Sequence, residues 1–119
     1  MIRKEFRIVW PSESGDYFQV LFEQEADSPE TDYFLLQCQF EDPDDEDFYI
    51  ESNDTQFCCG HVQVEAAVLN RRWLRLEMAS TKWKSIEIAF TADEEIYAEL
   101  ARVLTTMFED RLRHARHDA

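Results

Sequence analysis

The stretch TADEEIYAELARVLTTMF, residues 91–108, is where the spacing of the hydrophobic residues changes and where the fold is decided. Its apolar side chains recur three and four residues apart, as on one face of an amphipathic helix. They are Ile96, Leu100, Val103, Leu104, Met107 and Phe108. Thr91 and Glu94 form a T-x-x-E capping box, which satisfies free N–H groups at a helix start. The sequence therefore predicts a helix over about residues 92–113 and a fraying tail at 115–119.

The residues before this helix alternate between apolar and polar, which is the period of half-buried strands. The apolar sets are Phe6/Ile8/Trp10, Phe18/Val20/Phe22, Phe34/Leu36/Cys38/Phe40, Phe48/Ile50, Val62/Val64/Ala66/Val68, Leu74/Leu76/Met78 and Ile86/Ile88/Phe90. Pro11 predicts the end of the first strand. Asn70 and Arg71 predict a short hairpin, since Asn tolerates a positive φ.

Short links between successive strands favour an antiparallel meander, and the helix needs one sheet face on which to bury its apolar side. We therefore expect an α+β fold for a single domain, residues 1–119, in which an antiparallel β-meander sheet of about six to seven strands is packed by one C-terminal α-helix. The helix would cover the face that carries Phe34, Leu36, Ile50 and Val64. The other face would carry Tyr33, Leu35, Tyr49, Leu69, Trp73 and Trp83.

Charge is distributed very unevenly along the chain. No lysine or arginine lies between Arg7 and Arg71, and the sixteen Asp and Glu residues in that gap account for essentially all of the net charge of −14. Such a region builds a negative field that steers encounters with positively charged surfaces, although solubility alone is the plainer interpretation. Nucleic acid and anionic membranes are disfavoured as partners, because they require clustered lysine and arginine.

The cysteines and the N-terminal residues indicate which cellular compartment to expect for the protein. Cys38, Cys58 and Cys59 are an odd number with an adjacent pair, which favours reduced thiols in the cytoplasm over a disulfide framework. Residues 1–10 lack the apolar core of a signal peptide, and the longest near-apolar run, 33–40, is too short to span a bilayer.

The densest acidic run is Glu41–Asp47, in which every residue but Pro43 is acidic. Alternate carboxylates suggest calcium, but a twelve-residue loop counted from Asp42 places Asp47 where a glycine is needed. A solvated loop and a contact surface for a basic partner are the other two interpretations. We expect no bound metal here.

A second candidate is the segment Cys58-Cys59-Gly60-His61. Adjacent cysteines are poorly spaced for zinc, and no second Cys or His pair lies nearby. A Cys59–His61 nucleophile pair would need an orienting group and an oxyanion site that the sequence does not indicate. Gly60 fits a bulge or a tight strand entry. With only two glycines the chain has no phosphate loop, so we expect neither an enzyme nor a cofactor.

Three segments together resemble the immunity protein 10 family of bacterial polymorphic toxin systems. They are Tyr33-Phe-Leu-Leu-Gln37, Phe48-Tyr-Ile-Glu-Ser-Asn-Asp54 and Cys59-Gly-His-Val62, followed by a strand pair and a terminal helix. The family has a Y-x-x-x-Q strand and then a Y-[VI]-E-x-N-D strand. This chain departs from the family pattern at Cys59, which takes the place of one residue of a glycine pair. The resemblance covers roughly residues 33–108 and implies a small cytoplasmic inhibitor of a toxin domain.

We therefore expect a non-catalytic acidic protein, monomeric when free, that binds a basic protein partner, a toxin domain. Tyr and Trp dominate binding hot spots, although exposed rings also simply shield a thin sheet. The expected contact residues are Asp42, Asp44, Asp45, Glu46, Asp47, Tyr49, Glu51, Tyr33 and Trp73. The alternative from another class is a small acidic secretion chaperone, which would dimerise.

Overall fold

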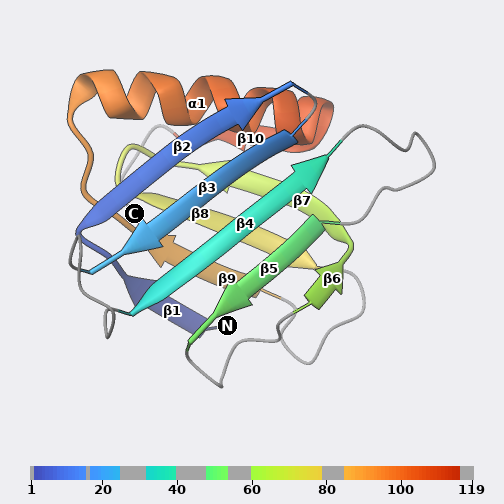
Figure 1. Ribbon diagram of the computed structural model, residues 1–119, viewed down its shortest axis with the longest axis horizontal. Coiled ribbons are helices and arrows are strands. Elements are labelled where there is room, and N and C mark those ends of the chain that lie inside the picture. Colours follow the sequence, from blue (N-terminus) through green and yellow to red (C-terminus); the bar gives the residue numbers. More distant parts are fainter. Residues whose placement is uncertain are drawn as a thin grey trace.

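The strands divide between two β-sheets that face each other across one hydrophobic core (Figure 1). The computed structural model describes residues 2–15, 17–24, 32–39, 48–53, 60–78 and 85–115. Within these ranges it contains ten β-strands and one α-helix. The predicted α+β class and C-terminal helix are confirmed, but the strands form two five-stranded sheets instead of one meander.

Sheet A has the strand order β1-β9-β8-β7-β10. Its strands are β1 (Ile2–Glu5), β9 (Ser85–Ala89), β8 (Trp73–Met78), β7 (Val64–Leu69) and β10 (Leu112–His114). The central pairs β7–β8 and β8–β9 are antiparallel, as predicted for hairpins. The two outer strands pair parallel to their neighbours, so the first and the last described strands each form an edge of this sheet.

Sheet B is antiparallel throughout and follows the chain order β2-β3-β4-β5-β6. Its strands are β2 (Ile8–Ser14), β3 (Tyr17–Glu23), β4 (Tyr33–Gln39), β5 (Phe48–Ser52) and β6 (Gly60–Val62). Figure 1 shows this sheet in front of sheet A, with the helix along the top of both. Sheet B alone is thus a meander of the kind that the sequence predicted.

The chain first changes sheet at a tight corner between β1 and β2. The N–H of Phe6 donates to the carbonyl of Ala89 in sheet A (2.8 Å), and the next N–H, of Arg7, donates to Glu23 in sheet B (3.2 Å). This corner resets the alternation, so Val9 is buried and Trp10 is exposed. The prediction that Trp10 shares a buried face with Phe6 is therefore wrong.

The second change of sheet occurs at Gln63. Val62 ends β6 in sheet B and Val64 begins β7 in sheet A, and both side chains are buried. The single strand predicted over residues 62–68 is therefore two strands.

A bulge at the start of β7 then reverses the faces of that strand. The register with β8 shifts between Val64 and Ala66, which is how one extra residue enters a strand. Ala67 and Leu69 consequently point into the core. The sequence placed Leu69 on the outer face, and this assignment is wrong because period-two counting does not see the bulge.

Two turns also differ from expectation. β2 continues through Pro11 to Ser14, because β2 is an edge strand and proline there costs no ladder hydrogen bond. At the β7–β8 turn Asn70 acts through its side chain, whose Oδ1 accepts from the N–H of Arg72 at 2.9 Å. Among the described non-glycine residues the positive φ belongs to Glu109 instead.

The helix α1 (Glu94–Phe108) closes one side of the two-sheet sandwich. It contacts β2 and β3 of sheet B and β7 and β10 of sheet A. Phe108 stacks on Phe48 of β5 with ring centroids 4.6 Å apart, and Phe22 of β3 lies 5.9 Å from Phe90 after β9. The predicted inward face is buried, but the second sheet covers it together with the helix.

Both ends of α1 differ from the predicted bounds of 92–113. The N-cap is Asp93, whose Oδ1 accepts from the N–H of Ile96 at 2.8 Å, and not Thr91. The helix ends at Phe108 and is followed by a 3₁₀ turn, η1 (Glu109–Arg111), and by β10. The chain leaves the helix there because β10 joins the open edge of sheet A, and of the predicted tail only Ala115 is described.

Candidate protein-binding face

The outer face of sheet B is a broad surface of tyrosine, glutamine, leucine and glutamate side chains. Residues on β3, β4 and β5 alternate between buried and half-buried, because one side faces the core and the other faces outward. The half-buried residues of these strands that alternate with the buried ones, and so face outward, are Tyr17, Gln19, Leu21, Glu23, Tyr33, Leu35, Gln37, Tyr49 and Glu51. We call this set, with Trp10 of β2 and His61 of β6, the outer face of sheet B.

One part of this face is a glutamate held by two tyrosines. The hydroxyl of Tyr49 donates to Glu51 Oε1 at 2.8 Å, and the hydroxyl of Tyr33 donates to Glu51 Oε2 at 2.9 Å. Tyr49 precedes Glu51 on the same side of β5, and Tyr33 reaches it diagonally from β4. The hydrogen bonds from Tyr49 and then Tyr33 hold the pKa of the Glu51 carboxyl below its ordinary value. This position therefore keeps its negative charge and a fixed orientation.

A second polar group lies one row along the same face. Register places Gln19, Gln37, Tyr49 and His61 side by side across four strands. Gln19 Oε1 accepts from Gln37 Nε2 at 2.9 Å and from the Tyr17 hydroxyl at 3.3 Å. The His61 ring meets the Tyr49 ring edge-on, with centroids 5.5 Å apart. These contacts fix the side chains of the face against one another.

An apolar row crosses the face in register with Glu51 and next to the second polar group. Trp10, Leu21 and Leu35 are register neighbours on β2, β3 and β4, and the row ends at Glu51 on β5. Trp10 is 47% exposed, and it is the exposed large hydrophobic residue of the described chain. A sheet face that carries an exposed tryptophan, tyrosines and an oriented carboxylate has the composition of a protein contact surface.

Side-chain hydrogen bonds also join β4 to β5 at the end where Tyr33 and Ser52 lie. The Tyr33 N–H donates to Asn53 Oδ1 at 3.0 Å, and Ser52 Oγ donates to the Tyr33 carbonyl at 2.8 Å. Asn53 in turn donates from Nδ2 to Asp32 Oδ1 at 3.1 Å. The residues that carry the tyrosine–glutamate group thus sit on rigid strands.

The charge of this face follows directly from the gap in basic residues. All of its side chains come from residues 10–61, where the sequence has no lysine or arginine. One acidic residue of the gap, Glu13, pairs through Oε1 with Arg102 of α1 at 2.6 Å, and Arg102 also pairs with Glu99. That pair lies on the helix side of β2, not on the outer face.

The structure brings together three of the nine predicted contact residues, namely Tyr33, Tyr49 and Glu51. Trp73 lies on β8 in the other sheet, where Arg75 covers its ring at 4.9 Å, so it is not part of this face. The acidic stretch at 42–47 lies outside the described residues, as do Cys58, Cys59 and Trp83.

Sequence reasoning missed the contribution of Trp10, Gln19 and Leu21 to this face. The alternation of β3 already carried the signal for Gln19 and Leu21, since Phe18, Val20 and Phe22 form its apolar set. Trp10 could not be placed, because its orientation depends on the corner at Phe6 and Arg7.

Comparison of the chain with models of known protein families, with curated proteins and with solved structures finds no match. Among the described residues, no group of three or more His, Cys, Asp or Glu side chains is arranged to hold a metal ion. Over the same part of the chain, no helix has the length and apolar character needed to cross a membrane.

Proposed function

We propose that this protein is a non-catalytic acidic binding module and that it uses the outer face of sheet B to dock on a basic protein partner. The observation that carries the proposal is the Tyr33–Glu51–Tyr49 group, in which both carboxylate oxygens are already hydrogen-bonded. An ionised carboxylate of fixed orientation, flanked by rings, suits a guanidinium or ammonium group of a partner.

The particular partner that we propose is a toxin domain, so that the protein acts as a cytoplasmic immunity protein. This part of the proposal comes from the resemblance to the immunity protein 10 family. The tyrosine and glutamine of the Y-x-x-x-Q motif are Tyr33 and Gln37, and the tyrosine and glutamate of the following motif are Tyr49 and Glu51. All four side chains belong to the outer face of sheet B, which supports a shared role in binding.

In this proposal, electrostatic attraction raises the rate at which the protein associates with its partner. Complementary fields raise association rates and depend strongly on salt, whereas buried rings set the dissociation rate. The acidic stretch Glu41–Asp47 adds to the field in this proposal through its charge alone. A fast inhibitor of this kind blocks a basic active site without any chemistry of its own.

The test is capture of the partner from the native cell, followed by growth rescue. We expect tagged protein to retain a basic protein, and co-expression to restore growth of cells that produce this partner. A captured partner whose toxicity is unaffected by co-expression would contradict the immunity role. A dimeric free protein that keeps a secreted, non-toxic effector would favour the chaperone alternative.

A further inference from the structure

Glu51 on the outer face of sheet B has room for a further hydrogen-bonding partner. Its two carboxylate oxygens each accept one tyrosine hydroxyl, at 2.9 Å from Tyr33 and at 2.8 Å from Tyr49. An ionised carboxylate has about four acceptor positions, so a position on each oxygen stays open. Glu51 is half-buried and forms no ion pair within the described part of the chain. The carboxylate is therefore oriented, but its charge is not balanced by a cation.

The strands of sheet B cannot supply this cation. The residue directly opposite Glu51 on β4 is Leu35, and Leu21 and Trp10 follow in register on β3 and β2. The sequence has no lysine or arginine in residues 8–70, and all five strands of sheet B lie inside that range. A cation for Glu51 therefore has to come from outside this sheet, as it would from a bound partner.

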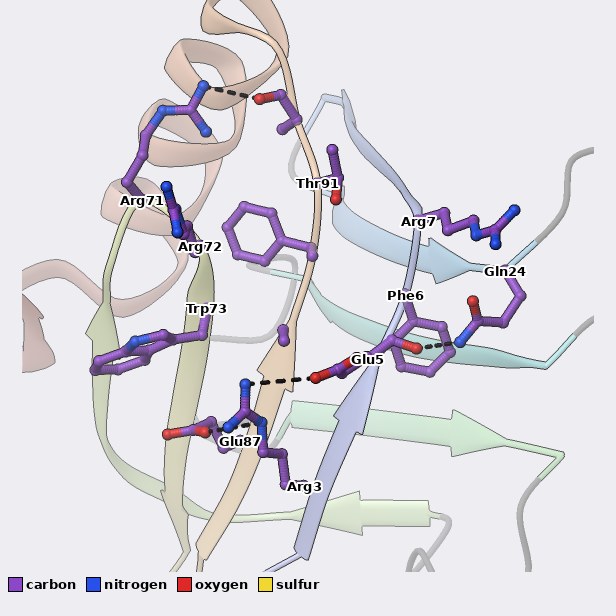
Figure 2. Close-up of a pocket in the computed structure, with 13 residues that line it drawn as sticks. Arg3, Glu5, Phe6, Arg7, Gln24, Arg71, Arg72, Trp73, Glu87 and Thr91 are labelled. Carbon is purple, nitrogen blue, oxygen red and sulfur yellow. Dashed lines mark hydrogen bonds and ion pairs between the residues drawn. The ribbon is translucent and has the colours of Figure 1, made fainter. Parts of the chain in front are cut away.

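Sheet A contains a related arrangement in which an arginine is already present. Glu87 on β9 lies directly opposite Arg75 on β8 and accepts from its Nη2 at 3.0 Å. The guanidinium carbon of Arg75 lies 4.9 Å from the centre of the Trp73 ring. Figure 2 shows Glu87 with Trp73 and with Arg3, its second ion-pair partner at 3.3 Å, where they line a hollow at the end of sheet A. A sheet face of this protein thus holds a guanidinium between a carboxylate and an aromatic ring.

We infer that the partner places an arginine side chain on Glu51 and that lysine is a poor substitute for it. This inference rests on the proposed function of the outer face of sheet B and names the residue type that this face recognises. A guanidinium presents two parallel N–H donors, which match one open position on each oxygen of a carboxylate. An ammonium is a compact, strongly hydrated point charge whose donors diverge from one nitrogen, so it does not match the pair of oxygens.

The apolar row beside Glu51 suits the rest of such an arginine. Long charged side chains bury their CH₂ groups along apolar surface and keep the charged head in a polar setting. Neighbouring strands are about 4.8 Å apart, so along the row Leu21 lies about 10 Å and Trp10 about 14 Å from Glu51. An arginine that approaches along this row lays its CH₂ groups on Leu35. The exposed ring of Trp10 is then left for an apolar residue of the partner near that arginine.

The test uses short random peptides displayed on phage, because the choice between arginine and lysine can be measured without the natural partner. We expect selection on the whole protein to enrich peptides that carry an arginine near an apolar residue. In a synthetic copy of the tightest peptide, lysine in place of this arginine should weaken binding by about tenfold, as measured by calorimetry. A charge-assisted hydrogen bond contributes about that factor.

Three variants of the protein then locate the preference. Glu51→Gln keeps the size of the side chain and removes its charge, so the two peptides should bind it equally. Tyr33→Phe with Tyr49→Phe keeps the charge but removes both hydroxyls, so this variant should bind the peptide and lose most of the arginine preference. Glu65→Gln is the matched control, since it removes the same charge from an exposed position on β7 in the other sheet, and it should keep the preference.

Four results would overturn the inference. They are equal binding of the arginine and lysine peptides by the native protein, an arginine preference that persists in Glu51→Gln, loss of the preference in Glu65→Gln as well, and a selection that yields no Glu51-dependent peptide.

The proposed function is tested separately, by competition between the arginine peptide and the partner captured from the native cell. A Glu51-dependent arginine peptide that does not displace this partner would contradict the proposed docking face and not the arginine site. Loss of partner binding in Glu51→Lys, together with equal binding of the two peptides by the native protein, would overturn the arginine inference alone.

Discussion

At the scale of single residues, the account depends on how Glu51 is held. Its two carboxylate oxygens accept from different strands, through Tyr49 on β5 and Tyr33 on β4. Both bonds favour the charged form, so they act on the pKa in the same direction. The half-buried position makes this a local effect on charge and orientation, and it is not a large source of stability.

The first prediction concerns the titration of Glu51. Replacing Tyr33 and Tyr49 with Phe removes both hydroxyl donors, so the carboxyl pKa should rise towards its ordinary value, as measured by NMR titration. In the native protein the folded pKa lies below the unfolded one. The stabilisation by these bonds is therefore present above the unfolded pKa and is lost as the pH falls through the folded pKa.

Tyr17→Phe is the matched control, because the Tyr17 hydroxyl donates to Gln19 and not to Glu51. It should leave the titration of Glu51 unchanged. An unchanged Glu51 pKa in the double variant would show that the two tyrosines do not set the charge of this face.

A second prediction concerns Cys38. Burial between strand and core raises the pKa of this thiol to about 11, against a smaller opposing influence of Arg111. The reactive thiolate is therefore scarce near neutral pH. With Cys58 and Cys59 replaced by Ser, the native protein should resist alkylation at pH 8 and react only when it is unfolded. Rapid labelling of the native chain would show that Cys38 is accessible and ionised.

At the scale of elements, the predicted N-cap of α1, Thr91, and the observed N-cap, Asp93, can be distinguished by substitution. Asp93 accepts from the N–H of Ile96 and has the extended backbone of an N-cap. Asp93→Ala should lower the free energy of unfolding by about 1 kcal/mol. Thr91→Ala removes the residue of the predicted capping box and should change it by less than about 0.5 kcal/mol. Denaturant unfolding of the two variants checks this, and a larger loss at Thr91 would restore the predicted cap.

Much of the secondary structure could be predicted from the sequence. The helix and most strands were predictable, because their apolar residues recur with periods set by local geometry. Tyr33, Tyr49 and Glu51 were also predictable as neighbours, since alternate residues of adjacent strands share a face.

The division into two sheets was not predictable, because no local signal marks it. The corner at Phe6 and Arg7 contains neither Gly nor Pro, and Gln63 changes sheet in a single residue. The bulge in β7 similarly inverts the assignment of Leu69 without altering composition. The hollow at the end of sheet A that Arg3, Arg7 and Arg71 line depends on the parallel pairing of β1 with β9. This pairing joins distant segments, and periodicity does not reveal it.

At the scale of the whole molecule, the fold separates two kinds of surface. The outer face of sheet B is built from residues 10–61 and contains no cation, whereas the basic side chains around Arg7 and Arg71 gather at the end of sheet A. One acidic residue of the gap, Glu13, shares Arg102 of α1 with Glu99, and the Glu13–Arg102 pair joins the helix to β2. Of the sixteen acidic residues in the gap, the described ranges include Glu13, Glu23, Asp32, Glu51 and Glu65, and of these Glu23 and Glu51 belong to the outer face of sheet B.

The central claim is that the outer face of sheet B, and not the overall acidity, binds the partner. The most direct measurement compares Glu51→Lys with Glu95→Lys, which makes the same change of charge on exposed α1. Both should fold, as checked by thermal unfolding. Using the partner captured from the native cell, we predict that Glu51→Lys weakens binding by about a hundredfold, since it places a like charge at the contact, and that Glu95→Lys changes it by less than about threefold. Equal effects of the two substitutions on the measured dissociation constant would contradict the claim.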